Sequence, residues 1–223
     1  MVPAPCAGCG TEGERLSLEV CGHCVAALDG LRAFATRPTP PPPGLPPCYA
    51  LGDYGDELRE LIIGFKDRGR HRLAQPLGGL LAETVATAVP EGPVLLVYVP
   101  DTGAAARERY GDHMRRMAAA AARRLQHAGR PAMVAGCLRA RPKADSAGLD
   151  MAQRAEAARA AFLPSGSGRA QALRGARDAS VILVDDVITT GVTLAAAAQV
   201  LDEQGIHVDA CATLAATRRR MPA

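Results

Sequence analysis

The sequence predicts an α/β protein with a mainly parallel, twisted sheet flanked by helices and a small cysteine-rich module ahead of it. Two observations support this prediction. Apolar runs typical of buried strands alternate with helical periodicity over residues 49–223, and such alternation produces right-handed parallel crossovers. Upstream, four cysteines form two closely spaced pairs, and a proline run follows them.

Length and composition restrict the class of protein. A chain of 223 residues holds one sizeable core with room for a small appendage. Aromatic residues make up 3%, with no Trp, so the stacking platforms of a dedicated single-strand nucleic-acid binder are missing. A net charge of +3 does not by itself indicate a polyanionic partner.

No membrane span is expected, because no apolar run approaches roughly 18 residues. The N-terminus has neither the basic start nor the apolar core of a signal peptide. We therefore expect a cytoplasmic protein, in which seven cysteines serve as metal ligands or free thiols rather than as disulfides.

Three segments are expected along the chain: a four-cysteine zinc-binding module at 1–37, a linker at 38–48 and the main domain at 49–223. Seven prolines fall within residues 38–47, which predicts an extended spacer outside the core. A proline-rich ligand motif is the alternative. In the main domain, periodicity predicts strands at 49–53, 94–99, 132–138, 181–184 and 206–214 and helices at 56–66, 71–88, 104–127, 149–162 and 193–204, with a Ser/Gly loop at 164–168.

The most informative segment covers residues 181–193 and reads VILVDDVITTGVT. A buried strand delivers two adjacent carboxylates, Asp185 and Asp186, to the edge of the sheet where α/β proteins bind ligands. A turn rich in threonine then opens a helix, and backbone amides and hydroxyls at such a turn suit a phosphate. Because carboxylates do not suit a phosphate, they would meet sugar hydroxyls, with Mg²⁺ as a further possible partner. The pattern indicates a sugar phosphate; the alternative is a capped helix with two solvated aspartates.

This segment closely resembles the phosphoribosyl pyrophosphate (PRPP) signature of type I phosphoribosyltransferases. The resemblance implies that Asp185 and Asp186 contact the ribose hydroxyls and that the following residues hold the 5-phosphate. The implied PRPP-binding residues are Asp185, Asp186, Val187, Ile188, Thr189, Thr190, Gly191, Val192 and Thr193.

Two further segments extend the resemblance to the family. The loop after residues 94–99 stands where the family contacts pyrophosphate, with Pro100, Asp101, Thr102, Arg107 and Arg109 as candidates. Residues 138–149 stand where the family has a mobile loop, and their small and basic residues suit a lid; ordinary surface charge is the alternative. The residues expected to carry catalysis are Asp185, Asp186, Arg139 and Lys143.

The cysteine pairs are Cys6-x₂-Cys9 and Cys21-x₂-Cys24, separated by eleven residues. Four thiolates in this spacing complete the tetrahedral coordination of a structural Zn²⁺, as in a zinc-ribbon-like module. An iron–sulfur cluster and redox or incidental thiols are the alternatives. Too few apolar residues lie in 1–37 for an independent core, so the metal would supply much of the folding energy.

The four-cysteine module, the proline break, the helix pattern at Tyr54–Lys66 and the PRPP signature together resemble the ComF family, which is linked to competence, DNA uptake and natural transformation. The resemblance implies binding of PRPP or ribose 5-phosphate with Mg²⁺, and transfer of phosphoribose with release of pyrophosphate. Three positions depart from the family pattern: Tyr110 replaces a glycine after Arg109, residues 154–157 lack an asparagine, and Asp101 places a negative charge in the pyrophosphate loop.

Two functions of different class are therefore weighed. One is a glycosyltransferase that moves phosphoribose to an acceptor. The other is a catalytically silent accessory protein whose zinc module binds single-stranded DNA or a helicase-like competence protein, with local support only from basic residues at 115–124 and 218–220. Metabolic salvage of a nucleobase is disfavoured, because no acceptor-stacking aromatic stands near the C-terminus.

Overall fold

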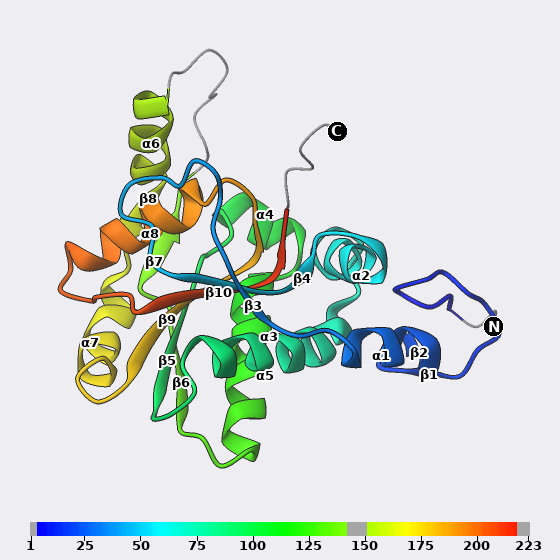
Figure 1. The fold of residues 1–223 in the computed structure, drawn as a ribbon. Helices are drawn as coiled ribbons and strands as arrows, with labels where there is room; N and C mark the ends of the chain where they lie inside the picture. The colour runs from blue at the N-terminus through cyan, green and yellow to red at the C-terminus, as the bar shows by residue number, and fades with distance from the viewer. Residues whose placement is uncertain (1–3, 142–150, 218–223) are drawn as a thin grey trace.

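A six-stranded sheet forms the centre of the computed structural model, which describes residues 4–141 and 151–217 (Figure 1). The strand order is β3-β4-β10-β9-β5-β6, and every neighbouring pair is parallel except β3–β4. The strands are β3 (Phe34–Thr36), β4 (Cys48–Asp53), β5 (Val94–Tyr98), β6 (Ala132–Ala135), β9 (Ser180–Ile188) and β10 (Ala210–Ala216). The predicted fold class is confirmed.

Helices cover both faces of this sheet (Figure 1). One face carries α2 (Asp56–Asp67), η1 (His71–Leu73), α3 (Ala74–Ala88) and α5 (His113–His127). The other carries α7 (Gly166–Gly175) and α8 (Val192–Asp202), with α6 (Met151–Ala160) beside α8. The remaining elements are β1 (Leu16–Ser17), β2 (Val20–Cys21), α1 (Gly22–Asp29), α4 (Gly103–Glu108), β7 (Leu138–Ala140) and β8 (Phe162–Pro164).

The central strands are buried on both sides, which explains why they are continuous apolar runs in the sequence. Along β5, Val94 and Leu96 belong to the core under α2, α3 and α5, whereas Leu95 and Val97 belong to the core under α8. Alternate side chains of one strand therefore hold both helical layers.

The single helix predicted at 104–127 is wrong. The chain forms α4, breaks and then starts α5, with Tyr110 at φ 54° and Gly111 at φ 129° between them. The Asp112 side chain accepts a hydrogen bond from the Arg115 backbone N–H at 3.0 Å and caps α5. Alanine-rich periodicity continues through this break, so it concealed a glycine and a capping residue that mark a new helix.

Other expected boundaries also differ, and Phe162, the end of the helix predicted at 149–162, begins β8 instead. The strand predicted at 132–138 ends at Ala135, and Leu138–Ala140 turns away to pair with β8. The loop predicted at 164–168 already contains the start of α7. Strand β9 continues to Ile188, so both aspartates lie within it, and β10 begins only at Ala210. These ends are set by pairing with neighbouring strands, which local periodicity does not report.

The first 48 residues are more closely joined to the sheet than the sequence indicated. Strand β3, inside the range assigned to the cysteine module, pairs antiparallel with β4. Leu45, from the proline-rich segment, packs against the core under α8. Thus a spacer expected to lie outside the core has one side chain in contact with it. Among the described residues, no helix is long and apolar enough to cross a membrane.

Close packing of α3 on α5 generates a matched pair of variants. A Cβ at Gly78 would lie 2.4 Å from the Ala120 Cβ, whereas a Cβ at the adjacent Gly79 meets nothing within 4 Å. Gly79→Ala should raise the free energy of unfolding by about 0.5–1 kcal/mol, because glycine is costly inside a helix. Gly78→Ala should lower it by about 1–3 kcal/mol through overpacking. Urea unfolding of both variants measures the difference, and equal stabilisation would contradict this packing.

Candidate functional site

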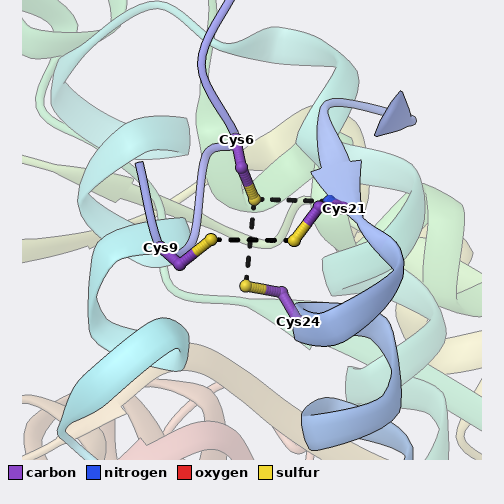
Figure 2. A group of neighbouring side chains, drawn as sticks. All are labelled: Cys6, Cys9, Cys21 and Cys24. Carbon is purple, nitrogen blue, oxygen red and sulfur yellow. Dashed lines mark hydrogen bonds between the residues drawn. The ribbon is translucent and has the colours of Figure 1, made fainter. Parts of the chain in front are cut away.

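The four predicted zinc ligands converge in the N-terminal module (Figure 2). Their sulfur atoms all lie within 4.8 Å of one another, with Cys6 and Cys24 Sγ 3.8 Å apart and Cys9 and Cys21 Sγ 3.6 Å apart. An ion about 2.3 Å from four tetrahedral sulfurs separates them by about 3.8 Å. The cluster therefore has the dimensions of a structural zinc site.

Electrostatics also favour a cation between these sulfurs. Hydrogen bonding with Thr11 lowers the pKa of the Cys9 thiol to about 6. Burial, together with the neighbouring thiols, raises the pKa of Cys24, because another negative charge is unfavourable there. Four thiolates so close together need a bound cation to offset their charge.

The module differs from a zinc ribbon in the secondary structure that holds its second cysteine pair. Cys21 ends β2, and Cys24 lies in the first turn of α1, so the second pair opens a helix. Gly8 sits against this turn, since a Cβ there would lie 2.9 Å from the Cys24 sulfur. Only glycine allows the first loop to approach the fourth ligand so closely.

Metal analysis tests the cluster directly. Purified protein should carry about one Zn²⁺ per chain, and Cys6→Ser should lose it because three thiolates leave the coordination sphere open. Cys137→Ala, a change at a buried cysteine outside the cluster, should keep the metal. Iron in the purified protein, or no metal under reducing conditions, would contradict the zinc assignment.

The PRPP-like signature occupies the end of β9 and the start of α8. Asp185 is partly exposed and Asp186 is buried. Thr189 and Thr190 are exposed, Thr193 lies in the first turn of α8, and Gly191 stands immediately before that helix at φ 74°. The threonines and the free amides of the helix N-terminus are thus available to an anion.

The proline-rich segment supports this loop from outside the matched motif. A Cβ at Gly191 would lie 3.0 Å from Leu45 Cδ2 and 3.1 Å from Pro38 Cγ. Gly191 is therefore required for two reasons, its left-handed backbone and its contact with residues about 150 positions earlier.

A second matched pair of variants, Gly92→Ala and Gly191→Ala, separates backbone strain from contact with the proline-rich segment. Gly92 has φ 77° and open space around its Cβ position, so Gly92→Ala tests backbone strain alone. Gly191→Ala should reduce the free energy of unfolding by about 1–3 kcal/mol more than Gly92→Ala, because overpacking is added to strain. Thermal or urea unfolding provides the comparison. Equal losses of free energy of unfolding in the two variants would show that Pro38 and Leu45 move away from the new methyl group at no cost.

Asp186 is held by two cationic side chains. Lys66 Nζ lies 2.7 Å from Asp186 Oδ2, and His113 Nε2 lies 3.4 Å from the same oxygen. The other oxygen, Oδ1, accepts the Val187 backbone N–H at 2.8 Å. The carboxylate thus joins α2, α5 and the first residue after the acidic pair.

Ion pairing gives the two aspartates opposite pKa shifts. Burial alone would raise the pKa of Asp186, but His113 and Lys66 outweigh it and hold that pKa below its ordinary value. Burial, and then the charge of Asp186, raise the pKa of Asp185 to about 8. Burial alone would lower the pKa of His113, yet Asp101 and Asp186 raise it to about 9. Asp186 is therefore the anionic member of the pair.

Asp101 points into this network. Its carboxylate pairs with Arg109 at 2.8 Å and bonds to His113 Nδ1 at 2.5 Å. Arg109 also contacts Asp67 at 3.0 Å. The negative charge that departs from the family pattern is consequently neutralised inside the protein, and Arg109 is engaged by two carboxylates.

Next to this network lies a cleft of about 740 Å³. The predicted residues Pro100, Asp101 and Arg139 line it, whereas residues 185–193 do not. Its other lining residues are Tyr98, Gly103, Asp112, Arg115, Ala119, Val134, Gly136, Leu138, Ala140, Ser165 and Gly168. The cleft and the threonine loop are thus separate surfaces, connected through Asp101, His113 and Asp186.

The other positions that the sequence analysis singled out are Thr102, Arg107, Lys143 and Tyr110. Thr102 caps α4 by accepting the Ala105 N–H at 3.2 Å, and Arg107 is exposed on that helix. Lys143 lies outside the described residues, as does most of the expected lid. Tyr110, which replaces the family's glycine, has a left-handed backbone and is 82% exposed.

Sequence reasoning did not assign Lys66 or His113 to the site. Lys66 and His113 each end a segment that carries the ComF resemblance, at 54–66 and 99–113, but that resemblance gave neither residue a role. Only the juxtaposition of α2, α5 and β9 reveals their contact with Asp186.

Comparison with protein families agrees with the α/β fold. Residues 112–222 match the family model of the phosphoribosyl transferase domain. The matched segment includes Asp185 to Thr193 and excludes the cysteine module and Lys66. No curated protein matches the sequence.

Proposed function

We propose that this protein is a ComF-type phosphoribosyltransferase that binds PRPP in the cytoplasm and transfers its phosphoribosyl group to an acceptor. The principal support is the end of β9, where two carboxylates precede exposed threonine hydroxyls and the free amides of α8. The match of residues 112–222 to the phosphoribosyl transferase domain supports the same substrate class. The four-cysteine module, with its zinc-like dimensions, supports the ComF assignment.

The loop would bind the 5-phosphate and the aspartates would bind the ribose. Amides at the start of α8 and the hydroxyls of Thr189, Thr190 and Thr193 would donate to phosphate oxygens, where the helix dipole favours negative charge. Asp185, the more exposed carboxyl, would bond to a ribose hydroxyl. Asp186 would contribute its charge while remaining paired with Lys66 and His113.

Catalysis would then depend on position and charge. The bond between the anomeric carbon and pyrophosphate breaks, the acceptor's lone pair forms the new bond to that carbon, and pyrophosphate leaves with the bonding electrons. The cleft beside Pro100 and Asp101 would receive the leaving group, with Arg139 on its rim. Arg115 adds a second cationic side chain to the lining.

Magnesium would enter with the substrate. Asp101 and Asp186 are each engaged by cationic side chains, so they do not form an open carboxylate site for a metal. When bound to the PRPP oxygens, Mg²⁺ would neutralise the charge of the departing pyrophosphate. The protein would supply the shape and the fixed donors around that complex.

An accessory protein would differ from an enzyme in one observable result. It would bind PRPP, but no acceptor would cause the release of pyrophosphate from PRPP. Of the basic residues cited for a DNA or helicase partner, those at 218–220 lie outside the described residues, and three of those at 115–124 have contacts within the protein. Arg115 lines the cleft, Arg116 bonds to His71 Nδ1 at 2.9 Å, and Arg124 lies 3.9 Å from Glu83. These positions favour the enzyme.

Binding of Mg²⁺·PRPP tests the proposal without knowledge of the acceptor. PRPP at a hundredfold excess over its dissociation constant should raise the free energy of unfolding by about 2.7 kcal/mol. Asp185→Asn should weaken binding by roughly 0.5–1.5 kcal/mol, the effect of one altered hydrogen bond to a ribose hydroxyl. Asp178→Asn, an exposed change away from the loop, should have no effect. Thermal melts and calorimetry provide the measurements.

Competition between PRPP and smaller ligands tests the same site. Ribose 5-phosphate shares the phosphate and two hydroxyls with PRPP, so it should displace PRPP more readily than free pyrophosphate does. Zinc-replete protein that shows no stabilisation by Mg²⁺·PRPP would refute the proposed function.

A further inference from the structure

Lys66 reaches the proposed ribose site from outside the family-matched segment. It lies near the end of α2, 120 residues before its partner Asp186, and its Nζ atom is 2.7 Å from Asp186 Oδ2. The Asp186 side chain is 10% exposed, so this pair lies at the boundary of the core. Two other ion pairs of the same helix, Arg59–Glu60 and Arg68–Glu60, are more exposed.

Packing of α2 fixes where Lys66 can reach. Leu61, Ile62 and Phe65 are buried in the core they share with α3 and α5. The Phe65 ring meets the ring of His113 edge to face, with centroids 5.9 Å apart. The helix that carries Lys66 therefore also contacts His113, the second cationic partner of Asp186.

Asp186 transmits this constraint to the loop. One oxygen accepts from Lys66, and the other accepts the backbone N–H of Val187. Val187 is the first residue of the segment that would hold the phosphate. Turning the Asp186 carboxylate would therefore release the start of the loop as well as the acidic pair.

We propose that Lys66 is a positioning residue of the PRPP site, which acts through Asp186 to fix the acidic pair and the start of the phosphate loop. The inference rests on the proposed function, because it assumes that this site binds PRPP. It adds to the site a residue that lies before the phosphoribosyl transferase segment, on a helix packed against the cysteine module.

A double-mutant cycle on PRPP affinity tests the mode of action. The variants are Lys66→Met, Asp186→Asn and the combination, and calorimetry gives the dissociation constant of each. Lys66→Met should weaken binding roughly tenfold, the effect of one lost charge-assisted hydrogen bond. In the Asp186→Asn background, the same change should have no further effect, because the partner through which Lys66 acts is already altered.

Two control variants distinguish position from fold. Lys66→Arg should restore most of the affinity, since it keeps a cation beside Asp186. Arg68→Met, which breaks an exposed ion pair two residues further along the chain, should leave affinity unchanged. Circular dichroism and melting establish that each variant is folded, and Lys66→Gln replaces Lys66→Met if the latter does not fold.

The outcomes separate the two proposals. If the wild-type protein does not bind Mg²⁺·PRPP, the proposed function fails and the role of Lys66 fails with it. If the wild type binds and the two losses are additive, Lys66 contacts the ligand directly and the positioning role is wrong. Binding that is unchanged in Lys66→Met also overturns the inference, while the proposed function stands.

Discussion

A nearly buried carboxylate at the end of β9 sets the main constraint on this protein. Asp186 cannot remain charged in the core without partners, because burial of an unpaired charge is costly. Lys66 and His113 supply the partners from two different helices. The positions of α2 and α5, and of the loop between β9 and α8, thus depend on one another through this side chain.

The same constraint explains why the N-terminal region is part of the site's support. Cys6, Cys21 and Cys24 share a core with Leu58 and Phe65 of α2. The segment after the module then crosses to Gly191, where Pro38 and Leu45 approach the phosphate loop. The small module thus packs with α2, which carries Lys66, and the proline-rich segment packs on Gly191.

The charge network also explains the acidic residue in the loop after β5, which the sequence predicted to contact pyrophosphate. A carboxylate facing pyrophosphate would repel it, but Asp101 is turned inward and neutralised by Arg109 and His113. As a result, His113 links the loop after β5 with the acidic pair of β9. The departure from the family pattern is compensated within this structure, so it does not oppose the binding of an anion in the adjacent cleft.

Features encoded in short stretches were predicted from the sequence, because spacing and periodicity report local geometry. They include the paired cysteines, the buried strands and the segment from Asp185 to Thr193, whose order along the chain is enough to indicate a strand, an acidic pair and a helix start. The break at Tyr110 and Gly111 was missed although its signals were local, since the alanine pattern continues across it.

Only the tertiary structure decided which distant residues meet. Lys66 reaches Asp186, Pro38 reaches Gly191, and β3 joins the central sheet, each through contacts that no local pattern encodes. The sequence by itself determined the fold class, and its order of residues predicted the proposed phosphate loop. The arrangement of charge around that loop came from the packing of α2 and α5 on β9, because a solvated lysine and an ion-paired lysine look the same until the partner is in place.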